Sequence, residues 1–120
     1  MNDSDRLNLA YDILDYYNVS NNVIINCSFD KSILAFFNFD TGDIELCNDS
    51  RIKSDKAFTL SILHETKHAM EAQKVGLNNY GLNYEKQSVV LQRQNLDSYW
   101  DHNEEIKAET FAQREIKYWM

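Results

Sequence analysis

DKAFTLSILHETKHAMEAQK, residues 55–74, contains no Gly or Pro and places apolar residues at close to helical spacing. Ser54 is a suitable N-cap residue for this stretch and Gly76 a suitable stop, so we expect one helix of about five turns. The helix carries the sequence HETKH at residues 64–68, which uses two of the three histidines in the chain. Residues at positions i and i+4 of a helix lie on the same face, so both imidazoles are expected to face one point.

A metal ion at that point is the simplest partner for the two histidines. The residues that flank His64 and His68 are largely apolar, and a buried imidazole pair needs a partner for its ring nitrogens. Zinc suits the pair because imidazole is one of its usual ligands, and Glu65 would lie where it can accept a proton from a water molecule. A catalytic zinc site usually has three protein ligands and one open position, so a third ligand must come from elsewhere in the chain.

The C-terminal part of the chain offers this third ligand. EEIKAETFA, residues 104–112, predicts a second helix, and Asp101 with Glu104 has the spacing of a capping box at its start. One small, acidic face of this helix is formed by four residues: Glu105, Ala108, Glu109 and Ala112. We predict Glu105 as the third ligand and Glu109 as the acceptor of the free N–H of a ligand histidine. Three neighbours remain open as alternative ligands: Glu104, Asp101 and His102, the last of which we expect at the surface or in a cleft.

The two motifs together resemble those of the gluzincin metallopeptidases, and most of all the small ImmA/IrrE-type members, the minigluzincins. The resemblance rests on HETKH at residues 64–68, followed by EIKAETFA at residues 105–112. It implies a zinc ion held by His64, His68 and Glu105, with Glu65 as the general base. The implied function is hydrolysis of peptide bonds in a protein or peptide substrate, and such peptidases often cleave one regulatory protein.

The first half of the chain predicts the scaffold for this site. An amphipathic helix is expected over residues 4–18 with Ser4 as N-cap, followed by strands over residues 23–29, 32–39 and 44–47. The polar turn at residues 40–43 contains a Gly and favours a hairpin between the last two strands. The fold class is therefore α+β, with an N-terminal helix, a small three-stranded twisted sheet, the HETKH helix and a C-terminal Glu-bearing helix.

These elements are expected to form a single domain over residues 1–120, and their order resembles the minimal core of zinc peptidases, a zincin-like fold. In that family the substrate pairs in extended form with an edge strand of the sheet, and residues 44–47 are our candidate for this edge.

The linking segment between the motif helices is less regular. Gly and Asn recur over residues 76–84, which favours a loop, whereas residues 85–96 favour a helix. Peptide hydrolysis forms an oxyanion that a hydroxyl or an imidazole can stabilise. Four residues beside the motif helices are candidates for this role: Tyr80, Tyr84, Tyr99 and His102.

Composition narrows the classes of function and partner. A net charge of −7 without clustered Lys or Arg argues against nucleic-acid binding. The acidic N-terminus is unlike a signal peptide and no apolar run approaches a membrane span, so we expect a cytoplasmic monomer without a membrane partner. Cys27 and Cys47 are expected to be buried thiols rather than a disulfide.

Two other classes of function remain open at this point. A non-catalytic zinc protein with the same fold would use its site for stability or partner recognition, but it would have no need for Glu65. In a metal-free regulatory or host-interaction protein the histidines would be incidental, and the metal content of the purified protein distinguishes this class from the others.

Overall fold

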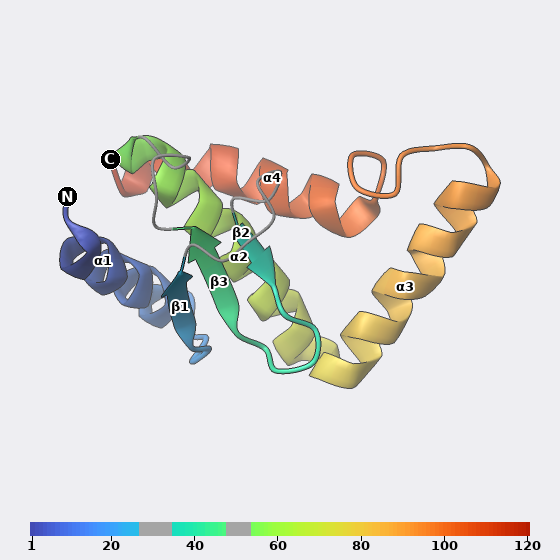
Figure 1. Cartoon of the computed structure of the whole chain (residues 1–120), viewed down its shortest axis with the longest axis horizontal. Helices are drawn as coiled ribbons and strands as arrows, with labels where there is room; N and C mark the ends of the chain where they lie inside the picture. Colours follow the sequence, from blue (N-terminus) through green and yellow to red (C-terminus); the bar gives the residue numbers. More distant parts are fainter. Residues whose placement is uncertain (27–34, 48–53) are drawn as a thin grey trace.

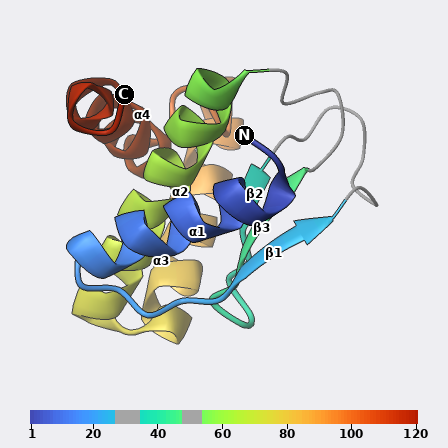
Figure 2. The ribbon, with the colours of Figure 1, turned by 90° about the vertical axis from the view of Figure 1, so that its left-hand side faces the viewer.

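The computed structural model describes residues 1–26, 35–47 and 54–120 (Figure 1). Its elements follow in this order: α1 (Asp3–Tyr16), β1 (Val23–Asn26), β2 (Ala35–Phe37), β3 (Ile44–Cys47), α2 (Asp55–Val75), α3 (Leu77–Arg93), α4 (Asn103–Glu115) and a short 3₁₀ helix, η1 (Ile116–Tyr118). Helices α1 and α2 cover one face of the sheet, and α4 packs on α2 (Figure 2). This arrangement confirms the α+β prediction.

The sheet is mixed, and its strand order is β1-β3-β2. Strand β3 pairs in parallel with β1 and antiparallel with β2, so the predicted hairpin between β2 and β3 is present. The prediction that residues 44–47 form an edge is wrong, because the chain returns from β2 to place β3 between the other two strands. The central position suits β3, since Ile44 and Leu46 are fully buried there.

Strand β2 ends at Phe37, two residues before the predicted end at residue 39, and residues 32–34 of the predicted strand lie outside the described residues. It ends where the side-chain oxygen of Asn38 accepts the backbone N–H groups of Asp40 and Thr41, at 2.9 and 3.2 Å, and turns the chain toward β3. Strand β1 is described as far as Asn26, and the remainder of the predicted strand, together with Cys27, lies outside the described residues. The same holds for the side chain of Cys47.

Helix α2 begins and ends where the sequence predicts. The Ser54 hydroxyl accepts the backbone N–H of Ala57 at 3.0 Å, and Gly76 ends the helix with a φ of 90° that side-chain-bearing residues rarely adopt. Helix α1 differs from the prediction at its start. Its cap is Asn2 rather than Ser4, because Asn2 and Asp5 form a reciprocal capping box that begins the helix earlier.

The prediction of a loop over residues 76–84 is wrong. After the turn at Gly76, helix α3 begins at once with Leu77, and Tyr80 is buried in the core. Gly81 lies against β2's following turn, where an added Cβ would be 3.4 Å from the Cβ of Phe39. Burial of Tyr80 and packing of the partly buried Leu77 against the core favour a helix in a segment whose Gly and Asn residues have low helix propensity.

Helix α2 is the centre of the hydrophobic core, which also takes side chains from α1, all three strands, α3 and α4. The fully buried members of the α2 face include Phe58, Ile62 and Leu63, one turn before the HETKH motif. These residues bury one face of α2 in the core, and the following residues of the same helix pack against α4. None of the helices in the described ranges combines the length and apolar composition needed to cross a membrane.

Candidate metal centre

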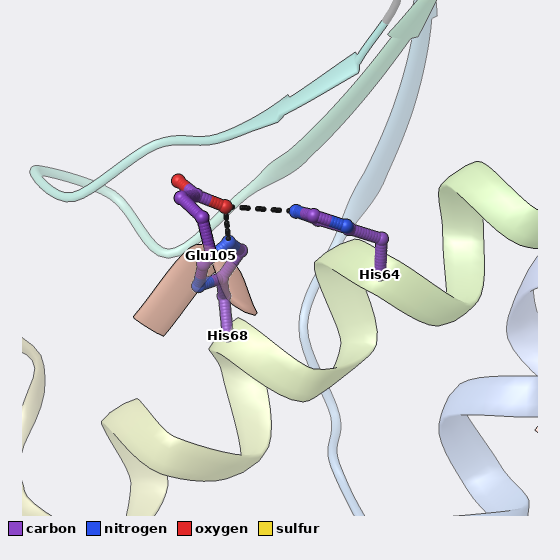
Figure 3. Close-up of side chains that lie close together, drawn as sticks. All are labelled: His64, His68 and Glu105. Atoms are coloured by element: carbon purple, nitrogen blue, oxygen red, sulfur yellow. Dashed lines mark hydrogen bonds and ion pairs between the residues drawn. The ribbon is translucent and has the colours of Figure 1, made fainter. Parts of the chain in front are cut away.

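His64 and His68 lie one turn apart on α2 and project toward the first turn of α4, where Glu105 meets them (Figure 3). Glu105 Oε1 lies 2.8 Å from His64 Nε2 and 2.7 Å from His68 Nε2. All three side chains are buried, and their candidate ligand atoms lie within 4.8 Å of one another. A metal ion could therefore be held by this group, which is the one such group in the ranges that the structure describes.

The chemistry of the three donors suits zinc. Two imidazole nitrogens and one carboxylate oxygen form one of the ligand sets of catalytic zinc sites, with bonds of about 2.0–2.2 Å. The contacts of Glu105 Oε1 with the two Nε2 atoms are hydrogen bonds of 2.8 and 2.7 Å, so these side chains would have to separate slightly to admit the ion. The Tyr84 hydroxyl donates a hydrogen bond to Glu105 Oε2, and this leaves Oε1 directed at the histidines.

The outer ring nitrogen of His64 contacts Glu109, one turn after Glu105 on α4. His64 Nδ1 lies 3.1 Å from Oε2 of Glu109, the residue predicted as the acceptor of an N–H of a ligand histidine. Glu109 Oε1 accepts a further hydrogen bond from Gln113 Nε2 at 3.0 Å. The hydrogen bonds from Gln113 and His64 hold the pKa of Glu109 below its usual range, which keeps it an acceptor.

The outer ring nitrogen of His68 has a different partner, one that is not predicted from the sequence. His68 Nδ1 lies 2.7 Å from the Tyr80 hydroxyl, which donates to Glu104 Oε2 at 3.3 Å. Tyr80 and Tyr84 are four residues apart on one face of α3, and this spacing was the signal that could have identified them. A spacing of four residues brings two side chains to one face only on a helix, whereas the sequence predicts a loop over residues 76–84.

The alternative third ligands point elsewhere. Glu104 contacts the Tyr80 hydroxyl through Oε2 and Lys107 Nζ through Oε1, the latter at 3.2 Å. Asp101 accepts the backbone N–H of Asp97 at 2.8 Å and does not form the predicted capping box. The N-cap of α4 is His102 instead.

His102 is fully buried, with 0% of its surface exposed, so the prediction of a surface position is wrong, although the residue lines a small pocket beside Tyr84 and Glu104. Its Nε2–H donates to the Tyr84 carbonyl at 3.0 Å, and its Nδ1 accepts the Glu104 backbone N–H at 3.1 Å. The ring also stacks on that of Tyr84, with centroids 3.7 Å apart. With both nitrogens engaged in these hydrogen bonds, His102 has no free nitrogen for a metal or an oxyanion, and its ring packs on Tyr84, whose hydroxyl contacts Glu105.

In the cluster, the positive charge of His64 and the negative charge of Glu105 stabilise each other. Burial alone would raise the pKa of Glu105, but hydrogen bonds from His64 and His68 hold it well below its usual range. Burial alone would lower the pKa of His64, but the hydrogen bond and charge of Glu105, with contributions from Glu65 and Glu109, raise it to about 9. Without metal, His64 is therefore protonated at neutral pH and forms an ion pair with Glu105.

Glu65 is the buried acid of the site that has no hydrogen-bond partner within the described residues, and 5% of its surface is exposed. Burial raises its pKa, and the nearby histidines only partly offset that effect. Glu65 and His64 line a groove of about 630 Å³, whose other walls come from β2, α2, α4 and the turn that carries Tyr99 and Trp100. Glu65 is thus placed to meet a molecule in this groove.

Three of the four residues that are candidates for stabilising the oxyanion already form hydrogen bonds to other groups. Tyr80 and Tyr84 bind the acids of α4, and His102 has no free nitrogen. Tyr99 differs, because its ring stacks on that of His64 and its hydroxyl lies 3.4 Å from His64 Nε2, on the groove side. It is the remaining candidate among the four.

Metal binding to the centre is expected to depend on pH. A metal must displace the proton of His64, whose pKa is about 9 without metal, so affinity should fall about tenfold per pH unit as the pH drops below that value. Zinc titrations against a competing chelator at pH 6.5, 7.5 and 8.5 would measure this slope. An affinity that does not change over this range would contradict a site built on His64.

Comparisons with family models, with curated proteins and with solved structures found no match to this chain.

Proposed function

We propose that this chain is a zinc-dependent peptidase of the gluzincin type with a zincin-like core, which hydrolyses peptide bonds of a protein or peptide substrate. The observation that carries the proposal is Glu65, a buried acid without a hydrogen-bond partner in the described residues, beside the His64, His68 and Glu105 cluster and in the wall of the groove. Burying an acid without a partner costs stability, and a purely structural metal site has no use for it.

Each side chain of the site has a distinct part in the proposed reaction. His64 and His68 would hold the ion through Nε2, and Glu105 through Oε1. When bound, zinc supplies Lewis-acid activation of a water molecule and of the scissile carbonyl. Glu65 accepts a proton from the attacking water and returns it to the leaving amine, a role favoured by its raised pKa. The Tyr99 hydroxyl is the candidate donor to the developing oxyanion.

In this proposal the substrate binds in the groove that Glu65 and His64 line. Ala35 and Phe36 of β2 line this groove together with Leu60 and Ser61 of α2. The exposed Trp100, on the turn before α4, lines it as well. We therefore propose β2, in place of the predicted residues 44–47, as the strand along which an extended peptide lies.

The test is cleavage of a quenched fluorescent peptide library by the purified protein with its metal content measured. We expect about one zinc ion per chain, loss of cleavage on removal of the metal with a chelator, and recovery on return of zinc. Zinc at full occupancy without cleavage of peptides or of candidate protein substrates would favour the non-catalytic zinc protein. Absence of bound metal, with no binding on titration, would contradict both.

A further inference from the structure

A buried phenol lies behind His68, on the side away from the cluster. Tyr80 is 5% exposed, and its hydroxyl lies between His68 Nδ1 at 2.7 Å and Glu104 Oε2 at 3.3 Å. The Tyr80 ring is held against Phe37 and Phe39, with centroids 6.3 and 5.8 Å away. The position of the hydroxyl is therefore set by the core and not by the metal centre.

The chemistry of these groups permits only one direction for the hydrogen bonds when a metal occupies the centre. An imidazole bound through Nε2 keeps its proton on Nδ1, so His68 must donate to the Tyr80 oxygen. An ionised Glu104 can only accept, so the Tyr80 proton must point toward it. Lys107 contacts the other carboxylate oxygen of Glu104 at 3.2 Å, which leaves Oε2 for Tyr80.

We propose that Tyr80 and Glu104 are positioning residues for His68, which fix its ring orientation and keep the lone pair of Nε2 directed at the metal. Neither residue touches the metal or the substrate. The two ligand histidines are thus held in different ways, since His64 meets Glu109 directly and His68 reaches Glu104 through a phenol. The proposal rests on the proposed metal centre, but it does not depend on peptidase activity.

Tyr80→Phe keeps the aromatic packing and removes only the hydroxyl. We expect zinc affinity to fall about 10–100-fold, the range typical when an outer partner of a ligand histidine is lost. The measurement is a zinc titration of the whole chain against a competing chelator, with the wild type measured first. Tyr118→Phe is the matched control, because it removes an exposed hydroxyl on η1, outside the metal centre, and should leave the affinity unchanged.

Glu104→Ala tests whether Glu104 acts on His68 through Tyr80 or only stabilises the fold. Because Glu104 acts on His68 only through Tyr80, the double variant Tyr80→Phe/Glu104→Ala should bind zinc as Tyr80→Phe does, with no further loss. Glu104→Ala alone should fall between the wild type and Tyr80→Phe. In the zinc-bound wild type, ¹⁵N NMR should find a slowly exchanging proton on His68 Nδ1, and Tyr80→Phe should make it exchange rapidly.

Wild-type zinc affinity in both Tyr80→Phe and Glu104→Ala would overturn the proposal, as would losses that simply add in the double variant. If Tyr80→Phe does not fold, Glu104→Ala and the NMR signal of the wild type still decide the question. A wild type that binds zinc but cleaves nothing, and whose variants show the expected losses of affinity, would support the positioning role of Tyr80 and Glu104 and contradict the peptidase. A wild type that does not bind zinc would overturn both.

Discussion

Glu65→Gln is expected to lower the turnover of peptide hydrolysis by roughly 10²–10⁴-fold and to leave zinc in place. Glutamine has the shape of glutamate but cannot accept the proton of the attacking water. The change does not touch His64, His68 or Glu105, whose side chains form the candidate metal centre. Turnover would be measured on a peptide that the wild type cleaves, and zinc content by inductively coupled plasma mass spectrometry.

Glu85→Gln is the matched control, since it makes the same change at an exposed position of α3 and should preserve turnover. Glu65→Gln should also unfold at a higher temperature than the wild type when both are metal-free, because a buried acid without a partner is replaced by a neutral amide. Cleavage by Glu65→Gln at the wild-type rate would exclude the general-base role.

Glu105→Ala is expected to weaken zinc binding by more than the roughly 10–100-fold associated with outer partners of a metal ligand, so that the purified protein carries little zinc. His64→Ala should have the same effect. The reason is that either change removes one of the three donors that converge at the centre. Chelator competition and the metal content of the purified protein would measure the loss.

Asp101→Asn provides the control for this second prediction. Asp101 was an alternative third ligand, but its carboxylate accepts a backbone N–H of the preceding turn, a role that asparagine can also fill. Zinc binding should therefore persist. The folded fraction must be checked for Glu105→Ala, because without its carboxylate both imidazoles lose a buried hydrogen-bond partner, which costs about 1–3 kcal/mol per group. A folded Glu105→Ala that still binds zinc fully would place the third ligand elsewhere.

The parts of the fold that were predictable from sequence depend on local signals. Helix α2 begins after Ser54 and ends before Gly76 because a hydroxyl cap and a positive φ act within one turn of the chain. Strand β3 matches its predicted bounds because a polar turn with Gly42 precedes it.

The incorrect predictions concern features that depend on distant contacts. Residues 77–84 are helical because Leu77 and Tyr80 pack into the core, an effect that outweighs the turn preference of Gly and Asn. The order of the strands depends on which partner β3 finds, and no local pattern encodes it. A surface position for His102 is also excluded, because Tyr84, 18 positions earlier, stacks on its ring and buries it.

The sequence by itself determined that two imidazoles, with Glu65 between them in the chain, face one point, because a single helical backbone sets that geometry. Only the tertiary structure decided that Glu105 meets them there and that Tyr80 stands behind His68. Glu105 is 41 positions from His64 and 37 from His68, so its approach depends on how α4 packs against α2. Side-chain packing between helices controls such distances, and it can be evaluated only when all the contacting surfaces are in place.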